Sequence, residues 1–238
     1  MENNALIINP SGPGKFVLVC EHATNYMPSE FDGLGLPEVA LQSHIAWDPG
    51  ALPVAEALAG YLDCPLVVPQ VSRLIIDCNR LPDVQSAMPE LSEAYCIPGN
   101  KGLTEAERND RALRFYYPFH RALDAILERK LAASRSTTML TVHSFNPVFN
   151  GVKRREEIGL IHDADARFAE AFRAILSDLT HLRVDLNAPY GPDDGVTHTL
   201  QRHGTVRGLP NIMVEIRNDL ITTPKTQVRN ATKRAKCV

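Results

Sequence analysis

The alternation of apolar, strand-like runs with amphipathic helical stretches predicts an α/β protein, in which helices cover both faces of a mainly parallel sheet. The chain of 238 residues suits one large domain, and we expect a single domain over residues 1–238 with its core at 16–222. The composition, 44% hydrophobic and 22% charged, is ordinary for a globular protein with a substantial core. Several of the strand-like runs end on ionisable side chains, which such a sheet would carry to one edge.

Six short runs rich in β-branched and other apolar residues are the predicted strands. They are Phe16–Cys20, Pro65–Pro69, Leu74–Asp77, Met139–His143, Ile158–His162 and Ile212–Ile216. Stretches with apolar residues at three- and four-residue spacing are the predicted helices, and they are Pro53–Leu62, residues 103–134 and Ala164–Leu179. At the start of the second helix, Thr104 and Glu107 fit a capping box.

Two segments stand outside this alternation. Leu81–Gly102 is rich in Pro, Ser and Gly, and it is predicted to form a long loop over the rim of the sheet, of the kind that often carries function. The basic tail, residues 223–238, indicates a fraying last helix, with a docking tail as the alternative.

The bulk composition excludes several kinds of partner. The formal net charge of −3 provides no general basic field for nucleic acid or an acidic membrane. The first residues lack the features of a signal peptide, and no apolar run is long enough to span a bilayer. Five scattered cysteines without a CxxC pair indicate reduced thiols. We therefore expect a cytoplasmic protein that binds neither nucleic acid nor membranes.

Polar residues end four of the predicted strands. Glu21–His22, the group Asp77, Asn79 and Arg80, the pair His143–Ser144, and Glu215 with Arg217 each follow or close an apolar run. Any one of them alone is more often a hydrogen-bonded support than a catalytic group. A parallel sheet would bring all four ends to the same rim. Imidazoles, carboxylates and guanidiniums together are typical of a metal-assisted hydrolytic site that holds an anionic substrate.

Six segments together resemble the N-formylglutamate amidohydrolase family: "CEHATN", "HIAWDPGA", "SRLIIDCNR", "LTEAERNDRALRFYYPFHRAL", "VHSFNP" and "IMVEIRNDL". The resemblance runs from about Val17 to Leu220, and it rests on the order and spacing of these segments. It implies a three-layer α/β/α sandwich around a mixed, mainly parallel sheet, of the phosphorylase/hydrolase-like kind found in zinc carboxypeptidases and aspartoacylase-type deacylases. In that fold a zinc site lies at the carboxyl ends of the strands.

The resemblance implies that His22 and His143 are imidazole ligands of a zinc ion (Zn2+). A hydrolytic zinc keeps three protein ligands and an open position. In the carboxypeptidase relatives the third ligand is a glutamate three residues after the first histidine, where this chain has Asn25. Asp48, which precedes a predicted helix, is the first alternative, although Asp is also a common N-cap. Glu21, the neighbour of His22, would point to the opposite face of an extended strand and serve as a supporting partner.

By the same resemblance, Glu215 corresponds to the general base and acid that activates water and protonates the leaving amine. A salt bridge to a basic neighbour is the alternative. Arg73 corresponds to the arginine that polarises the scissile carbonyl and stabilises the oxyanion. Asn79 and Arg80 correspond to a pair that holds a substrate carboxylate, and Asp77 is expected to orient one of the arginines.

Further candidates lie in the loops. Arg154 and Arg155 follow "NPVFNG" and could reach an anionic substrate or form a solvated basic turn, and Arg155 is kept as a substrate-binding candidate. The stretch "GVTHTLQRHG" is expected to form a substrate lid in which His203 approaches the site. Arg111 is expected to face solvent, with a substrate contact as the alternative.

The leading prediction is a metal-dependent amidohydrolase that cleaves the amide bond of an N-acyl amino acid. N-formyl-L-glutamate, which would yield formate and the amino acid, is the first candidate for its small, carboxylate-bearing substrate. One alternative is a deacylase or carboxypeptidase-like enzyme with another substrate. The other is a metal-free binding module for an anionic ligand, which Asn25 keeps open. A single zinc can bind His22 and His143 only if their nearest ring nitrogens lie within about 5 Å.

Overall fold

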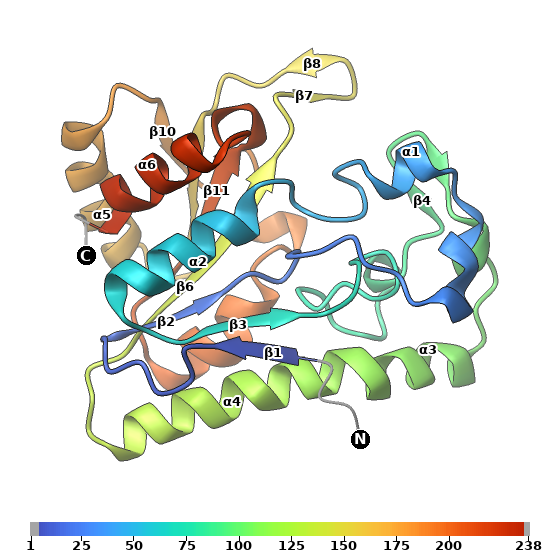
Figure 1. Cartoon of the computed structure of the whole chain (residues 1–238), viewed down its shortest axis with the longest axis horizontal. Helices are drawn as coiled ribbons and strands as arrows, with labels where there is room; N and C mark the ends of the chain where they lie inside the picture. Colours follow the sequence, from blue (N-terminus) through green and yellow to red (C-terminus); the bar gives the residue numbers. More distant parts are fainter. Residues whose placement is uncertain (1–4, 236–238) are drawn as a thin grey trace.

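A seven-stranded sheet runs through the centre of the molecule (Figure 1). The computed structural model describes residues 5–235. The strands follow the order β1-β3-β2-β6-β11-β9-β10 across the sheet. Their bounds are β1 (Ala5–Ile8), β2 (Phe16–Val19), β3 (Leu66–Pro69), β6 (Thr138–Phe145), β9 (Ile158–Ile161), β10 (Val184–Leu186) and β11 (Asn211–Arg217).

The four central strands β3, β2, β6 and β11 are parallel to one another. The outer strands reverse direction, since β1 is antiparallel to β3 and β9 is antiparallel to β11, while β10 runs parallel to β9. The prediction of a mixed, mainly parallel sheet is confirmed. The parallel centre matters for the site, because the carboxyl ends of β2, β6 and β11 lie at one rim.

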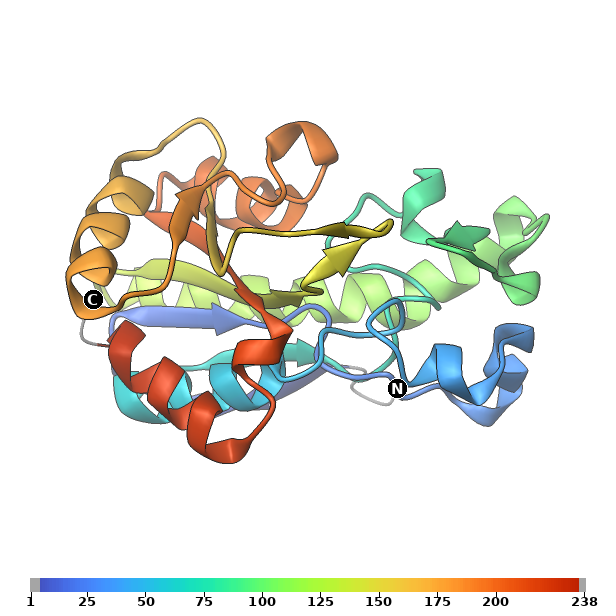
Figure 2. The ribbon, with the colours of Figure 1, turned by 90° about the horizontal axis from the view of Figure 1, so that it is seen from above.

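Helices cover both faces of this sheet (Figures 1 and 2). Side chains alternate along β2, so that Phe16 and Leu18 pack in one core while Val17 and Val19 pack in the other. The first core also contains buried residues of α2 (Ala51–Leu62), α5 (Arg167–Leu179) and α6 (Pro224–Ala235). The second contains the buried face of α4 (Tyr117–Ala132). The predicted three-layer arrangement is therefore confirmed.

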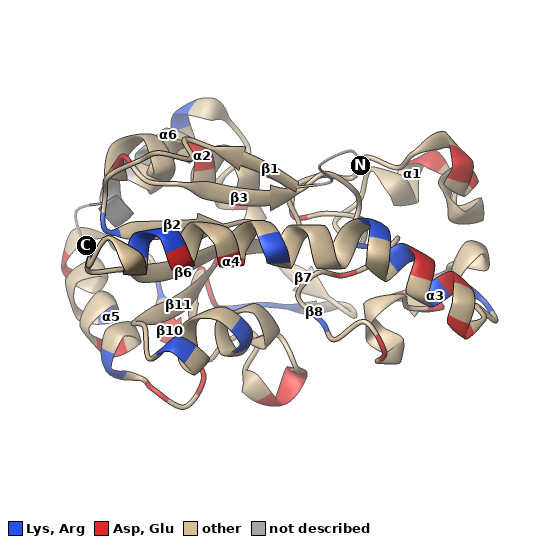
Figure 3. Ribbon diagram, turned by 90° about the horizontal axis from the view of Figure 1, so that it is seen from below, with Lys and Arg blue, Asp and Glu red and all other residues tan. Residues whose placement is uncertain are grey.

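The long helix predicted at residues 103–134 forms with one irregularity. It begins as α3 (Glu105–Arg111), passes through a π-helical turn at Ala112–Tyr116 and continues as α4. The capping box is present, because the Thr104 hydroxyl accepts the Glu107 N–H and the Glu107 carboxylate accepts the Thr104 N–H. Acidic and basic positions are interspersed along this helix (Figure 3).

The predicted strand Leu74–Asp77 is wrong, because this stretch forms turns. Leu74 and Ile75 are buried, but they pack in two small cores outside the sheet. The segment 81–102, which carries the short hairpin of β4 (Leu91–Ser92) and β5 (Tyr95–Cys96), contributes Met88 to one of these cores and Ile97 to the other. An apolar run of three residues indicates burial, and it cannot by itself distinguish a strand from a covered turn.

Several short elements were not predicted from the sequence. These are the strands β1 and β10, the helix α1 (Glu38–Leu41), and a hairpin formed by β7 (Val148–Phe149) and β8 (Val152–Lys153). Their length gives little periodicity to detect. No helix within residues 5–235 is long and apolar enough to cross a membrane.

The thiols agree with the expectation of reduced cysteines over the described part of the chain. Cys20, Cys64, Cys78 and Cys96 are free. Cys237 and the first four residues, on which part of the prediction about a signal peptide rests, lie outside the described residues.

Candidate active site

Three potential metal-ligand atoms converge at the carboxyl ends of the central strands. His22 lies just after β2, His143 lies in β6, and Asp48 lies in the loop that leads to α2. The two Nδ1 atoms of the histidines are 3.1 Å apart, and Asp48 Oδ2 lies 2.8 Å from Nδ1 of His143 and 3.3 Å from that of His22. All three side chains are buried, and among the described residues they form the one cluster suited to a metal ion.

The outer nitrogen of each imidazole contacts its own carboxylate. His22 Nε2 lies 2.8 Å from Asp77 Oδ1, and His143 Nε2 lies 3.0 Å from Glu21 Oε2. Burial raises the pKa of the Glu21 carboxyl, but the charge of His143 and its hydrogen bond outweigh burial, so that the pKa is lowered. Burial likewise opposes ionisation of Asp77, and His22 and Arg73 hold its pKa well below the usual value. Ionised carboxylates only accept hydrogen bonds, so each Nε2 donates.

This arrangement leaves the inner Nδ1 atoms free to act as ligands. When Nε2 of a neutral imidazole carries the proton, its Nδ1 presents a lone pair. Asp48 adds an anionic oxygen, because the charges and hydrogen bonds of His22 and His143 outweigh burial and hold its pKa well below normal. Tetrahedral zinc with nitrogens at 2.0–2.1 Å separates two ligands by about 3.3 Å, close to the spacing found here. The donor set therefore fits a zinc-type ion with an open fourth position.

The other candidates for a third ligand point elsewhere. The amide of Asn25 donates to the Leu41 carbonyl and to Gln42 Oε1. Glu21 contacts the outer side of His143, as the supporting partner that the sequence suggested. Asp48 does not cap α2, whose N-cap is Gly50, and its Oδ2 instead accepts the N–H of Ser144.

Arg73 links this cluster to the cavity beside it. Its guanidinium donates to Asp77 Oδ2 at 2.9 Å and lies 3.5 Å from Asp48 Oδ1. Burial lowers the pKa of Arg73, but these two carboxylates outweigh it and raise the pKa overall. The side chain remains 28% exposed, so a guanidinium fixed by two acids also reaches solvent-accessible space.

Glu215 lies in β11, between His143 on β6 and Gly159 on β9. Its Oε2 is buried and has no hydrogen-bond partner within the described residues. Burial, with a smaller contribution from the charge of Asp48, raises the pKa of Glu215 to about 7 although the charge of His143 opposes the shift. A Cβ at position 159 would lie 3.2 Å from the Glu215 Cβ and 2.1 Å from the Ala188 oxygen, so only glycine fits. Because its pKa is raised to about 7, Glu215 can exchange a proton near neutral pH.

A cavity of about 280 Å³ opens beside Arg73 and Asp77. The predicted rim loop supplies one wall, and Phe149 of the β7–β8 hairpin and Tyr190 supply another. The rim loop contributes Ser86, Pro89, Leu91, Ser92 and Glu93, and the other lining residues are His44, Ile45 and Leu74. The size suits a small molecule.

Asn79 and Arg80 bind a neighbouring backbone segment. The Asn79 amide donates to the Val196 carbonyl at 2.5 Å and accepts the Thr199 N–H at 2.9 Å. Arg80 donates to the carbonyls of Asn79 and Gly195. These contacts hold the Gly195–Thr199 stretch, part of the predicted lid, against the turn after Asp77.

Two sequence candidates have other surroundings. His203 is fully buried, with Nδ1 3.0 Å from Asp124 Oδ1 and Nε2 2.7 Å from His120 Nδ1. Arg155 is exposed. The structure thus brings together His22, Asp48, His143, Arg73, Asp77 and Glu215, and its contacts give no support to a substrate role for His203 or Arg155.

Sequence reasoning missed Tyr190 and Phe149. Phe149 lies in the two-residue strand β7 and Tyr190 in a loop, and neither ends a predicted strand, so no signal in the sequence pointed to them. Of the two alternatives for Arg154, a solvated basic turn was favoured over contact with an anionic substrate, whereas its guanidinium lies over aromatic rings.

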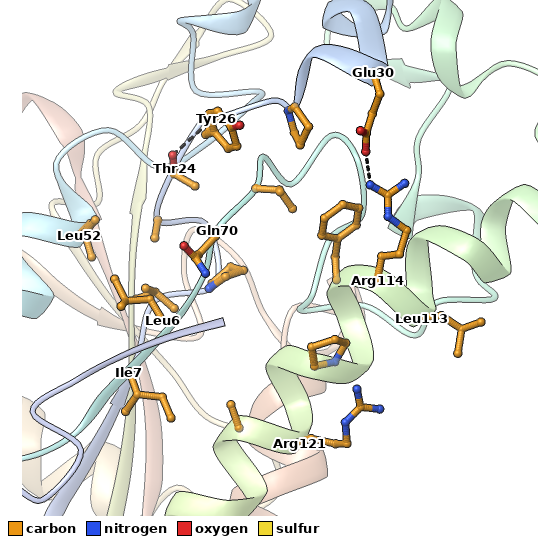
Figure 4. Close-up of a pocket in the computed structure, with 18 of the residues that line it drawn as sticks. Leu6, Ile7, Thr24, Tyr26, Glu30, Leu52, Gln70, Leu113, Arg114 and Arg121 are labelled. Atoms are coloured by element: carbon orange, nitrogen blue, oxygen red, sulfur yellow. Dashed lines mark hydrogen bonds and ion pairs between the residues drawn. The ribbon is translucent and has the colours of Figure 1, made fainter. Parts of the chain in front are cut away.

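A larger cavity of about 1310 Å³ lies along the β1 edge of the sheet, between β3, the segment after His22 and the α4 helix (Figure 4). Its lining is mostly apolar, and Glu30 and Arg114 form an ion pair beside it. None of the clustered polar residues of the candidate site lines this cavity. Arg73 and Asp77 of the cluster line the smaller cavity, which is therefore the candidate substrate cavity.

A family model and two solved structures match most of this chain. A family model described as N-formylglutamate amidohydrolase matches residues 14–222. The crystal structure of a gene product from Agrobacterium tumefaciens shares 46% sequence identity, with a TM-score of 0.95 over 98% of this chain and 92% of that one. An N-formylglutamate amidohydrolase from Ralstonia eutropha shares the fold, with 18% identity and a TM-score of 0.72 over 99% of this chain and 95% of that one. A search of curated proteins found no match.

Proposed function

The chain belongs to the N-formylglutamate amidohydrolase family, and we propose that it hydrolyses the formyl amide of N-formyl-L-glutamate or a close N-acyl analogue. The observation that carries this proposal is the convergence of His22, Asp48 and His143, each imidazole supported by a buried carboxylate, next to Glu215 with its raised pKa. Family membership supports a hydrolase of the amidohydrolase type. The identity of the metal and the substrate are parts of the proposal.

His22, Asp48 and His143 would hold zinc, with Glu21 and Asp77 fixing the orientation of the two imidazoles. Bound zinc would act as a Lewis acid that polarises the scissile carbonyl and acidifies water. Asp77 has a second task, because it also holds the guanidinium of Arg73 at the cavity. Arg73 would donate to the carbonyl oxygen as negative charge develops on it.

Glu215 would move the proton that the reaction requires. Its carboxylate takes a proton from the attacking water as the new C–O bond forms at the formyl carbon. It then delivers this proton to the amine nitrogen as the C–N bond breaks, and the products are formate and the free amino acid. A carboxyl with a pKa of about 7 can accept and release a proton near neutral pH, which suits both steps.

The Glu215→Gln substitution tests this assignment. It should lower kcat by about 10² to 10⁴-fold, because the proton acceptor is lost while the shape is kept. The protein should bind zinc and unfold at the same temperature as the wild type. Glu128→Gln, at an exposed position of α4, is the matched control and should retain full activity. Near-normal activity of the Glu215 variant would exclude the role as general base.

Metal analysis and a substrate panel test the remaining parts. Stoichiometric zinc in purified, metal-supplemented protein would support the enzyme, and its absence would favour the metal-free binding module. Comparing N-formyl, N-acetyl and peptide substrates would identify the acyl group. The free thiols of the described cysteines support our further proposal that the protein works in the cytoplasm.

A further inference from the structure

Arg154 lies in an aromatic cage, and two of the rings of this cage, Phe149 and Tyr190, line the candidate substrate cavity. Its backbone N–H donates to the Pro147 carbonyl at 2.9 Å, which anchors the residue beside the β7–β8 hairpin. The guanidinium carbon lies 4.6 Å from the ring centroid of Phe149, 4.7 Å from that of Tyr190 and 5.4 Å from that of Phe145. Three rings therefore surround the guanidinium within cation–π distance.

One terminal nitrogen of this guanidinium has an unused hydrogen-bond donor. Arg154 Nη1 is buried and has no hydrogen-bond partner within the described residues. The side chain does interact with Tyr190 through a hydrogen bond. No carboxylate among residues 5–235 forms an ion pair with it. A buried, charged N–H without an acceptor is costly, so an anionic acceptor supplied by a ligand would be bound favourably.

The cage adjoins the proposed reaction centre. Phe149 and Tyr190 line the cavity of about 280 Å³ together with Arg73 and Asp77. Phe145 lies in β6, two residues after His143. Arg73 is already held by the carboxylates of Asp48 and Asp77, which leaves its charge largely compensated. Over the part of the chain that the structure describes, Arg154 has no such carboxylate partner, and its guanidinium lies directly behind the wall that Phe149 and Tyr190 form.

We propose that Arg154 binds the side-chain carboxylate of the substrate and so makes the site select acidic N-acyl amino acids over their neutral amides. This inference rests on the proposed function. The rings around Arg154 exclude water and hold its planar fork ready for a carboxylate, which strengthens the pair.

Paired substrates test the proposal in the zinc-loaded enzyme. N-formyl-L-glutamate and N-formyl-L-glutamine differ only in the side-chain carboxylate. Arg154→Gln should lower kcat/KM for the glutamate substrate by roughly 10- to 100-fold, mainly through KM, because a charge-assisted hydrogen bond is lost. Activity toward the glutamine substrate should stay within about threefold of the wild type. An equal loss for both substrates, or no loss, would overturn the proposal.

Two further variants separate a lost contact from a damaged fold. Lys153→Gln removes an exposed cation from the preceding residue and should leave both substrates unaffected. Arg154→Lys keeps the charge without the planar fork, so it should show an intermediate loss of preference. If Arg154→Gln does not fold, an Arg154→Lys variant with unchanged preference would be sufficient to reject the proposal.

Equilibrium binding distinguishes this inference from the proposed function. Calorimetric titration of the zinc-loaded protein with L-glutamate and L-glutamine requires no hydrolysis. A preference for L-glutamate that disappears in Arg154→Gln would support the inference even if no N-formyl substrate were cleaved. Hydrolysis of both formyl substrates without any preference in the wild type would support the function and refute the inference.

Discussion

At the scale of single residues, the pairing of His22 with His143 is the feature that most constrains the chemistry. Two Nδ1 atoms 3.1 Å apart, with Asp48 beside them, require a positive charge between them. Without a metal a proton must take that place, and the charges of Glu21 and Asp48 outweigh burial to raise the pKa of His143 well above normal. A divalent cation would satisfy all three ligand atoms at once.

The support that the Glu21 carboxylate gives to the ligand His143 can be tested by substitution. Glu21→Gln should weaken zinc binding by about 10- to 100-fold, since a neutral amide oxygen accepts the imidazole N–H more weakly and no longer increases the basicity of the ring. Competition with a chelating indicator would measure the affinity. Glu128→Gln should bind zinc like the wild type. An affinity within about twofold of the wild type for Glu21→Gln would show that Glu21 does not support the metal site.

At the scale of elements, the turn at Leu74–Asp77 and the loop over it depend on a helix. Arg111 of α3 is buried, against the expectation of a solvent-facing side chain, and donates to the Ile75 carbonyl, to Asn100 Oδ1 and to the Gly99 carbonyl. Arg111 therefore connects the loop at residues 81–102, which forms one wall of the candidate cavity, to the turn before Asp77. The start of α3 is fixed by the capping box.

Thr104→Ala should lower the free energy of unfolding by about 1 kcal/mol, because the first N–H groups of α3 lose their side-chain acceptor. Urea unfolding would measure the change. Ser136→Ala, at an exposed position between α4 and β6, should change it by less than about 0.5 kcal/mol. Equal effects of the two substitutions would argue against a stabilising cap.

At the scale of the whole molecule, the topology concentrates titratable groups in two places. One is the candidate active site. The other contains His120, His198 and His203, where Tyr116 bonds to His198 and His203 bonds to both His120 and Asp124. Burial lowers the pKa of His198 and of His203 to about 4, and that of His120 well below normal. This second cluster makes stability depend on pH.

His203 makes the protein less stable as the pH falls, because the unfolded chain takes up a proton that the folded chain does not. This uptake at His203 occurs between about pH 6.5 and pH 4. The stability that the neutral His203 contributes is therefore fully present above pH 6.5 and is lost as the pH falls toward 4. His203→Gln should reduce the loss of stability between pH 7 and pH 4.5 by about 2 kcal/mol. Urea unfolding at both pH values would measure it. Exposed His181→Gln should lose as much stability as the wild type, and an undiminished loss in His203→Gln would contradict the assignment.

Much of this molecule could be predicted from local patterns. The apolar runs, the helical spacing and the Thr104–Glu107 pair determine elements through short-range periodicity and hydrogen bonding, so the α/β class and the layered, mainly parallel sheet followed from the sequence alone. The chemistry of residues at strand ends also singled out His22, His143 and Glu215. That one domain spans residues 1–238 stays a prediction.

Tertiary structure alone decided which loop residues meet at the site. Asp48 reaches the two imidazoles, while Asn25 bonds to the C-terminal end of α1, and no local pattern separates these two outcomes. Arg154 turns inward and Arg155 outward because the closure of one hairpin determines which neighbour faces the rings. Such choices depend on contacts between segments far apart in the chain, and the energy of those contacts exists only once the sheet has brought the segments together.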